Sequence, residues 1–296
     1  MNITDHGIQQ IDGTLSQEGS VLAGLELVAF SPTACQVPYS EENVHVRAYL
    51  RRLGILEWAR PLATRLSYWF ERRLFPFVRP RSAMWLRGLE RRYASERVVA
   101  IAAPQVNALS SRHFHFGGDR ISFVHHNYAP SYAKLFRTFF AHADRARICL
   151  VEIGILTGCG LAIWCDYFPN SRIIGLDHDL SHFEMSKPQL IQRGAFRHVS
   201  PEVQAFDAYA PQDPSSIGIS SINIVIDDGP HTEAAILETA KVLAPLLAEH
   251  FLYIIEDDVS AGLLVLDVVN EFRPARAFAS NGLAVIAPAQ IVRAAK

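Results

Sequence analysis

The segment Val151–Asp179 constrains the fold of this chain most strongly. It begins with an apolar run typical of a buried strand, continues through Gly154, Gly158 and Gly160, and ends with a second apolar run that closes on Asp177. Strand, glycine turn, helix, strand and acid follow one another in this order in nucleotide-binding βαβ units. Glycines let the backbone approach a ligand closely, and a terminal acid can accept hydrogen bonds from the hydroxyls of a ribose. The segment therefore predicts an adenosine-containing ligand.

The glycine spacing distinguishes between possible cofactors. A dinucleotide site has the pattern G-x-G-x-x-G, whereas this turn reads Glu152-x-Gly154-x-x-x-Gly158-x-Gly160. A carboxylate at this place repels a pyrophosphate but attracts the ammonium and sulfonium groups of S-adenosylmethionine. On these residues the chain resembles the class I S-adenosylmethionine-dependent methyltransferases. The resemblance implies Glu152, Gly154 and Gly158 at the methionine end of the cofactor and Asp177 at its ribose. A tight βα turn without a ligand remains the alternative.

The rest of the chain alternates between strand-like and helix-like segments, which predicts a doubly wound, mostly parallel α/β sheet. We expect strands at about 147–153, 172–177, 198–204, 221–227 and 250–256, and helices at about 160–168, 181–193, 232–248 and 259–271. The segment Arg276–Pro288 contains an Asn-Gly pair typical of a hairpin turn. A closing hairpin with an antiparallel last strand also resembles the seven-stranded, Rossmann-like sheet of class I methyltransferases.

Acidic residues follow several of the predicted strands. Asp227 and Asp228 follow the fourth strand, and Glu256 and Asp257 follow the fifth. Ligands of such sheets bind at the carboxyl ends of the strands, and a group of carboxylates there is costly without a cation. Hard oxygen ligands from two loops suit Mg²⁺, so we expect these four residues to hold a metal. Any single acid at a strand end also occurs as a helix cap or turn residue. Asp207, after the third strand, is the candidate for contact with the adenine.

Two stretches resemble a narrower family. The stretch INIVIDDGPHTEAAILETAKVLAPLLAEHFLYIIEDD is similar to the D-D-G-S-H and Y-x-I-E-D segments of the macrocin- and mycinamicin-type sugar O-methyltransferases. Upstream, GDRISFVHHNYAPSYAKLF is similar to their D-K, H-x-Y and Y-x-x-L-F pattern. The resemblance covers about half of the chain, roughly Gly118–Asp258. This chain departs from the family pattern at three places: it has Pro230 where Ser is usual, Arg120 where Lys is usual, and residues 248–250 where a Gly-Gly turn is usual. The last two departures leave the loop geometry and the substrate open.

This resemblance implies an S-adenosylmethionine- and Mg²⁺-dependent O-methyltransferase that acts on a hydroxyl of a sugar or a glycosylated metabolite. His231, three residues after Asp228, would be the general base, and Asp228 would belong to the same catalytic group. His125, Asn127 and Tyr128 would contact the acceptor. Two alternatives stay open at this point. One is a hydroxylase of the same fold, similar to cephalosporin hydroxylase, and the other is a non-catalytic scaffold that keeps the cofactor fold.

The N-terminal part has a different composition. We expect a mostly helical accessory region at 1–110 and the cofactor-binding domain at 111–296. The segment Arg47–Arg97 carries 13 arginines against four glutamates, together with three of the four tryptophans. Such a segment is compatible with helices that pack on a catalytic domain or on another subunit of a homo-oligomer, or with peripheral membrane contact. Nucleic acid is not expected, because this segment contains no lysine.

The sequence contains neither a secretory-signal pattern nor a membrane-spanning pattern. The N-terminus lacks the basic and apolar regions of a secretory signal, and the chain has no run of 18 apolar residues that would form a spanning helix. The four cysteines show no C-x-x-C spacing, so we expect reduced, buried thiols rather than a metal or redox motif. These features predict a cytoplasmic protein, with membrane association possible only through the arginine-rich segment.

Overall fold

The computed structural model describes residues 78–94, 98–101, 113–116, 118, 120–121, 126–140, 145, 147–210, 213–272 and 274–289. Most of the predicted accessory region lies outside these residues, as does His125. The described helices and strands are α3 (Ala83–Tyr93), β1 (Val98–Ile101), β2 (His113–Phe116), α4 (Ala129–Phe139), β3 (Cys149–Ile153), α5 (Cys159–Tyr167), β4 (Arg172–Asp177), α6 (Ser181–Gln192), β5 (Glu202–Ala205), β6 (Ile222–Asp227), α7 (Glu233–Leu243), β7 (Leu247–Ile255), α8 (Ala261–Val268), β8 (Ala275–Ser280) and β9 (Leu283–Pro288).

Seven of these strands form one sheet in the order β5-β4-β3-β6-β7-β9-β8. The pairs from β5 to β7 are parallel, and β9 pairs antiparallel with both β7 and β8. The chain order reverses between β3 and β6, and such a reversal opens a crevice for ligands at the carboxyl ends of the strands. The predicted α/β fold with an antiparallel closing hairpin is confirmed. A separate antiparallel pair, β1 with β2, lies outside this sheet.

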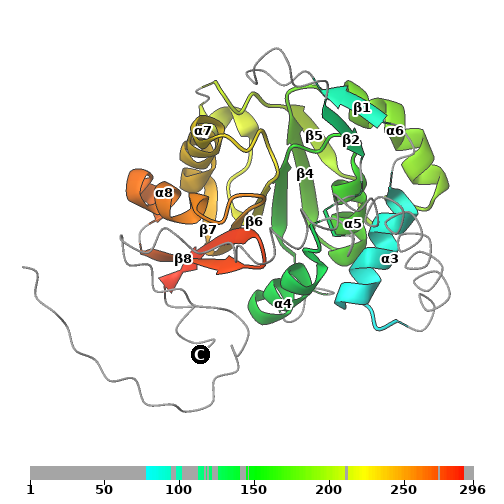
Figure 1. Ribbon diagram of the computed structural model, residues 1–296, viewed down its shortest axis with the longest axis horizontal. Coiled ribbons are helices and arrows are strands. Elements are labelled where there is room, and N and C mark those ends of the chain that lie inside the picture. The colour runs from blue at the N-terminus through cyan, green and yellow to red at the C-terminus, as the bar shows by residue number, and fades with distance from the viewer. Residues whose placement is uncertain are drawn as a thin grey trace, which may run out of the picture.

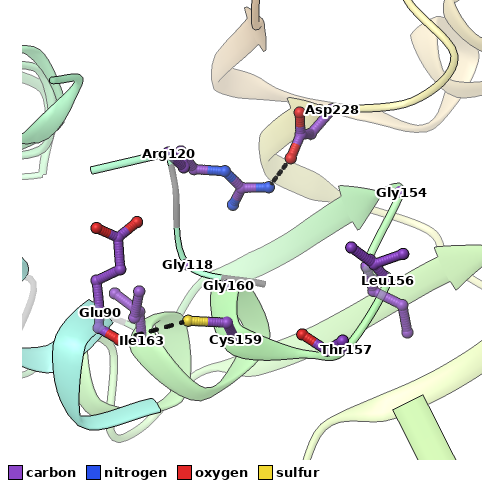
Figure 2. Close-up of a pocket in the computed structure, with 11 residues that line it drawn as sticks. Glu90, Gly118, Arg120, Gly154, Leu156, Thr157, Cys159, Gly160, Ile163 and Asp228 are labelled. Atoms are coloured by element: carbon purple, nitrogen blue, oxygen red, sulfur yellow. Dashed lines mark hydrogen bonds and ion pairs between the residues drawn. The ribbon is translucent and has the colours of Figure 1, made fainter. Parts of the chain in front are cut away.

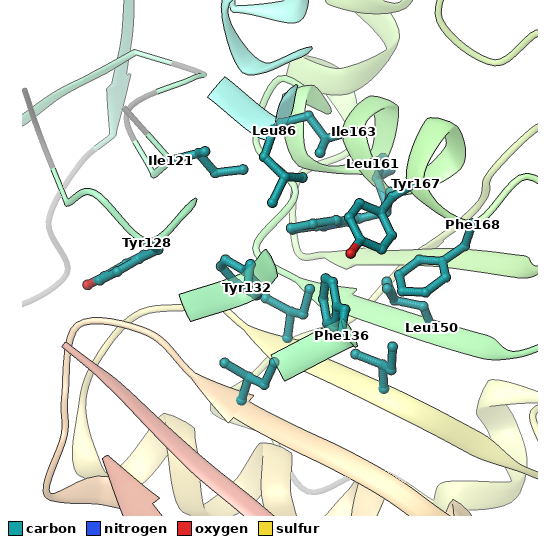
Figure 3. Packing of buried hydrophobic residues seen from close by; sticks show 14 of the residues in the cluster. Leu86, Ile121, Tyr128, Tyr132, Phe136, Leu150, Leu161, Ile163, Tyr167 and Phe168 are labelled. Carbon is teal, nitrogen blue, oxygen red and sulfur yellow. The ribbon is translucent and has the colours of Figure 1, made fainter. Parts of the chain in front are cut away.

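Helices cover both faces of the sheet (Figure 1), with α7 and α8 on one face and α3, α4, α5 and α6 on the other. The strands alternate between the two cores: Leu150 packs into the first and Val151 into the second. Because both faces are buried, the strands are apolar along most of their length. In the first core, aromatic rings of α4 and α5 pack together beside Leu86 (Figure 3), and Phe136 lies 5.7 Å from Trp164 between ring centroids.

Most predicted boundaries lie within a few residues of the observed ones. The largest difference is at α7, which ends at Leu243 instead of about residue 248. Pro245 lacks a backbone N–H and cannot continue the α-helical hydrogen bonds, so the chain forms a 3₁₀ turn over Ala244–Leu246. As a result β7 begins at Leu247 and is nine residues long.

The helix α3 belongs to the predicted accessory region but packs into the core of the cofactor-binding part. Leu86 and Leu89 are at most 1 % exposed, and α3 contacts both α4 and α5. Ser82 caps its first turn by accepting a hydrogen bond from the Trp85 N–H at 3.2 Å. The boundary at residue 110 therefore stays a prediction, and α3 contributes directly to the architecture around the cofactor motif. Within the described part of the chain, no helix is long and apolar enough to cross a membrane.

Candidate functional site

The glycine turn after β3 is shaped by close backbone contacts. Gly154 has φ +79°, and a Cβ built there would lie 2.1 Å from the backbone oxygen of Asp228. Only glycine tolerates both this conformation and this approach. Asp177, at the end of β4, accepts a hydrogen bond from the Leu156 N–H at 2.9 Å and so holds the turn open over the sheet edge. The turn and the end of β6 therefore form one continuous surface.

A cavity lies over this turn (Figure 2), and its lining residues come from α3, the segment that carries Gly118 and Arg120, the glycine turn, α5 and the end of β6. Its walls are formed by Glu90, Gly118, Arg120, Gly154, Ile155, Leu156, Thr157, Cys159, Gly160, Ile163 and Asp228. One buried oxygen in its wall, Thr157 Oγ1, has no hydrogen-bond partner among the described residues. Buried polar groups are normally paired, so this oxygen suits a polar ligand.

Glu152, the predicted contact of the methionine end, does not line this cavity. It is fully buried, and its Oε1 is bound by Nη1 of Arg120. Gly160 makes this arrangement possible, because a Cβ at Gly160 would lie 2.0 Å from Glu152 Oε1 and 2.6 Å from Arg120 Nη1. The guanidinium of Arg120 therefore lies between the Glu152 carboxylate and the cavity.

Arg120 also contacts two acids that follow β6 and β7. Its Nη2 binds Asp228 Oδ2, and its Nε lies 3.0 Å from Glu256 Oε2. Burial raises the pKa of the Glu256 carboxyl well above its ordinary value, with Arg120 opposing this shift, and burial likewise raises the pKa of Glu152. The ionised forms of these acids therefore depend on Arg120. The second Glu256 oxygen accepts a hydrogen bond from the Tyr132 hydroxyl.

A group of possible metal ligands lies beside Arg120. One atom each of Asp228, His231 and Asp257 lie within 4.8 Å of one another. Nε2 of His231 is 3.5 Å from Asp228 Oδ1 and 3.5 Å from Asp257 Oδ2. The side chains of these residues are 24–36 % exposed, so solvent and ligands can reach them. Two carboxylates and an imidazole at this spacing can hold a divalent cation or transfer a proton.

Asp257 is held from a second side by the segment before α4. His126 Nδ1 lies 3.0 Å from Asp257 Oδ1, and the Tyr128 hydroxyl donates to the same oxygen. Burial acts to raise the pKa of Asp257, but these hydrogen bonds outweigh it and lower the pKa to about 2. Asp257 is therefore ionised at every physiological pH.

Three residues of this site have backbone conformations that are uncommon for non-glycine residues. Asn127 has φ +58°, His231 φ +45° and Asp257 φ +61°. Such left-handed conformations cost free energy and gather at ligand-binding sites. Asn127 is fixed by a 2.6 Å hydrogen bond from Arg87 of α3, so its side-chain oxygen is already engaged.

The four acids predicted to hold a metal do not all converge. Asp228 and Asp257 do, whereas Glu256 is engaged by Arg120 and Tyr132. Asp227 points into the protein: its Oδ1 accepts from the Gly229 N–H at 3.2 Å, and its Oδ2 lies 3.5 Å from the Tyr253 hydroxyl. Burial raises the pKa of Asp227 to about 7.

The remaining predicted residues occupy separate places around the turn. Gly158, with φ +79°, lies against the ring of Phe183 and is the N-cap residue of α5. Asp207 follows β5, and its side chain accepts a hydrogen bond from the Tyr209 N–H at 2.9 Å. Both lie on the same edge of the sheet as the acids after β6 and β7.

Several residues of the site were not assigned by the sequence. Arg120 appeared only as a departure from a family pattern, and His126, which contacts Asp257, was given no role. Glu90 of α3 accepts a 2.6 Å hydrogen bond from the Ile121 N–H and so anchors the segment that carries Arg120. The signal that could have identified Arg120 was the number of acids that follow the strands, because buried carboxylates require a cation close to them.

Comparison with curated proteins finds similar sequences among sugar O-methyltransferases, while no family model matches the chain. The 8-demethyl-8-alpha-L-rhamnosyl tetracenomycin-C 2'-O-methyltransferase of Streptomyces olivaceus is 32 % identical over 181 residues, which cover 55 % of this chain and 41 % of that protein. The mycinamicin VI 2''-O-methyltransferase of Micromonospora griseorubida is 28 % identical over 162 residues, 52 % of this chain and 36 % of that protein. The chain thus spans about two fifths of the length of these relatives.

Among solved structures, the MycE methyltransferase of the mycinamycin pathway, in complex with Mg, SAH and mycinamycin VI, is 20 % identical with a TM-score of 0.44. The match covers 57 % of this chain and 50 % of that one. The strand order, the closing antiparallel hairpin and the glycine turn are those expected of class I methyltransferases. This chain therefore has the class I S-adenosylmethionine-dependent methyltransferase fold, and its sequence is similar to those of sugar O-methyltransferases.

Proposed function

We propose that this protein is an S-adenosylmethionine- and Mg²⁺-dependent O-methyltransferase acting on a hydroxyl of a sugar or a glycosylated metabolite. One observation carries the proposal: Asp228 lines the cavity over the glycine turn and also belongs to the group with His231 and Asp257. Because the two sites share a residue, a methyl donor in the cavity would lie beside an acceptor hydroxyl at the metal site. The names of both curated relatives support a sugar hydroxyl as the acceptor.

The cofactor, when bound, supplies a methyl group on a sulfonium sulfur. The turn at Gly154 and Gly158 would receive its methionine end, where Thr157 Oγ1 lines the cavity and is buried without a hydrogen-bond partner among the described residues. Asp177 would bind the ribose, because its two oxygens, which accept hydrogen bonds from the Leu156 and Asp179 N–H groups, each keep further acceptor capacity. Asp207 would contact the adenine from the end of β5.

The metal, when bound, supplies a Lewis acid that makes an acceptor hydroxyl more acidic. Asp228 and Asp257 would hold it, because each directs a carboxylate oxygen toward the same space. The oxygen donors and the partly open position of these side chains suit Mg²⁺. Asp227 and Glu256 would assist from behind these two ligands without contacting the metal, since their oxygens have other partners.

His231 would be the general base. Its Nε2 faces both Asp228 and Asp257 at 3.5 Å, so the ring is oriented toward the space where the acceptor hydroxyl would lie. In its neutral form the imidazole can accept the hydroxyl proton while the oxygen attacks the methyl carbon in line with the departing sulfur. His125, Asn127 and Tyr128 would border the acceptor, and the Tyr128 hydroxyl fixes Asp257 in place.

Calorimetric titration tests the two binding sites. Wild-type protein should bind S-adenosylhomocysteine and, separately, Mg²⁺, while Asp228→Asn should lose the Mg²⁺ heat because one of two carboxylate ligands is gone. Wild-type protein that binds neither would contradict the proposal and favour the scaffold alternative.

A second measurement separates the roles of His231. As a base, His231→Ala should keep Mg²⁺ affinity within about threefold and lose methyl transfer to a rhamnosylated acceptor by about 100-fold or more. If Mg²⁺ affinity falls instead by orders of magnitude, His231 is a metal ligand. The hydroxylase alternative requires two histidines and one carboxylate, whereas the group found among the described residues has one histidine and two carboxylates.

A further inference from the structure

Arg120 is a buried cation that lies among the strand-end acids. Three guanidinium nitrogens each lie beside a different carboxylate. Nη1 and Nη2 donate hydrogen bonds to Glu152 and Asp228, and Nε forms an ion pair with Glu256 at 3.0 Å without the geometry of a hydrogen bond. The side chain of Arg120 is only 10 % exposed, and its guanidinium carbon lies 6.0 Å from the ring centre of Trp164. Figure 2 shows the guanidinium directed at Asp228 above the glycine turn. Arg120 thus supplies positive charge to acids that would otherwise attract a metal ion.

The two oxygens of Glu256 both have partners. Oε1 accepts the hydrogen bond from Tyr132, and Oε2 faces Arg120 at 3.0 Å. Glu256 is 1 % exposed, and it lies outside the group that Asp228, His231 and Asp257 form. To bind a metal there, Glu256 would have to release the guanidinium or the Tyr132 hydroxyl inside the protein.

Asp228 contacts both Arg120 and the group of possible metal ligands. Its Oδ2 binds Arg120, whereas its Oδ1 faces His231 Nε2 at 3.5 Å. Arg120 therefore occupies one oxygen of Asp228 and leaves the other for a metal. A guanidinium this close to a divalent cation also repels it, because like charges a few ångströms apart interact strongly where water is scarce.

From these contacts we propose that Arg120 is a built-in counter-ion that withdraws Glu256 from the metal and restricts the carboxylate ligands to Asp228 and Asp257. This inference rests on the proposed metal site. Arg120 is a positioning residue in this scheme, since it acts through the carboxylates. Its consequence is a metal site that binds Mg²⁺ more weakly than the four strand-end acids alone would allow.

Titration of Mg²⁺ into wild type, Arg120→Gln and Arg120→Lys tests the charge effect. Arg120→Gln should bind Mg²⁺ about tenfold more tightly, because the repelling charge is gone and Glu256 is released. Arg120→Lys keeps the charge and should stay close to wild type. Arg172→Gln, which removes an exposed arginine far from these acids, is the matched control. Unchanged or weaker Mg²⁺ binding by Arg120→Gln overturns the inference.

A second pair of variants tests the ligands even if Arg120→Gln does not fold. Glu256→Gln can still accept the Tyr132 hydrogen bond and should keep Mg²⁺ affinity within about threefold, whereas Asp257→Asn should lose it. Loss of Mg²⁺ binding in Glu256→Gln would make Glu256 a ligand and overturn the inference. Binding of S-adenosylhomocysteine by the same samples distinguishes this failure from failure of the proposed function, in which wild type binds neither ligand.

Discussion

Arg120 and Arg172 bind carboxylates at opposite ends of the parallel strands. Arg172 begins β4 and binds Glu202, the first residue of β5, through two hydrogen bonds of 2.8 and 2.7 Å. Arg120 binds Glu152, Asp228 and Glu256 at the carboxyl ends of β3, β6 and β7. The side chains of the first pair are 43 % and 56 % exposed, whereas Arg120 and Glu152 are 10 % and 1 % exposed.

The difference lies in the surroundings rather than in the chemistry of the ion pairs. The charges of the exposed pair attract each other only weakly across water. This attraction is nearly offset by the hydration and the side-chain freedom that the two residues lose when they pair. In the buried cluster, removal of one partner leaves charges in a region that water cannot reach. The same arginine–carboxylate contact therefore contributes little at one end of the sheet and is hard to remove at the other.

The largest effect is expected for Arg120→Met. The change leaves three carboxylates without their shared cation and should lower the free energy of unfolding by about 3–5 kcal/mol. Urea denaturation at pH 7 without divalent ions measures it, with Arg172→Met as the exposed control. Equal losses in the two variants would contradict the burial argument.

Gly160→Ala tests the same cluster from the helix side. The new Cβ would meet Glu152 Oε1 and Arg120 Nη1, so we expect a loss of up to about 3 kcal/mol from overpacking. Gly218→Ala is the control: no atom lies within 4 Å of its Cβ, and only the left-handed backbone, φ +65°, costs about 1 kcal/mol. A loss no larger than that of the control would mean that the cluster rearranges freely.

Tyr132→Phe removes one hydrogen bond to the buried Glu256 and keeps the ring, which packs 5.1 Å from Trp164 between centroids. We expect the free energy of unfolding to fall by about 1.5 kcal/mol, as for hydrogen bonds to charged groups. Thermal unfolding of Tyr132→Phe beside Tyr209→Phe, which alters an exposed tyrosine, measures the difference. A stabilised Tyr132→Phe protein would show that Arg120 alone satisfies Glu256.

The smallest effect is expected for Arg172→Gln. The hydrogen bonds from Arg172 hold the pKa of Glu202 below its ordinary value, so the pair stabilises the fold above the unfolded-state pKa. This stability is lost as the pH falls through the lowered pKa of Glu202. Because the pair is exposed, Arg172→Gln should cost less than about 1 kcal/mol at pH 7 and almost nothing at pH 3. A difference that persists at pH 3 would have another origin.

Much of the fold could be predicted from local sequence. The apolar runs and the glycine turn predicted β3, β4 and β6 within two residues, and the Asn-Gly pair located the turn between β8 and β9. These predictions succeed because strand alternation and turn conformation depend on neighbouring residues. The acids at the strand ends were also visible, since parallel strands bring their carboxyl ends to one edge.

The choice among neighbouring acids required the tertiary structure. Asp227 and Asp228 are adjacent, yet Asp227 faces Tyr253 in the interior and Asp228 faces the cavity. Successive residues at a strand end point to opposite sides, and which side carries the ligand depends on the helices that cover the sheet. The sequence alone therefore assigned both to the metal.

The sequence determined the succession of strands and helices along the chain, the glycine turn, and the acids that follow the strands, because these depend on periodicity and local conformation. The tertiary structure decided which charges meet. Arg120 lies 32 residues from Glu152 and 108 from Asp228, and Glu90 of α3 anchors the backbone beside it. Such partners are selected by packing across the whole domain, because a buried charge is stable only where the fold brings its counter-charges together.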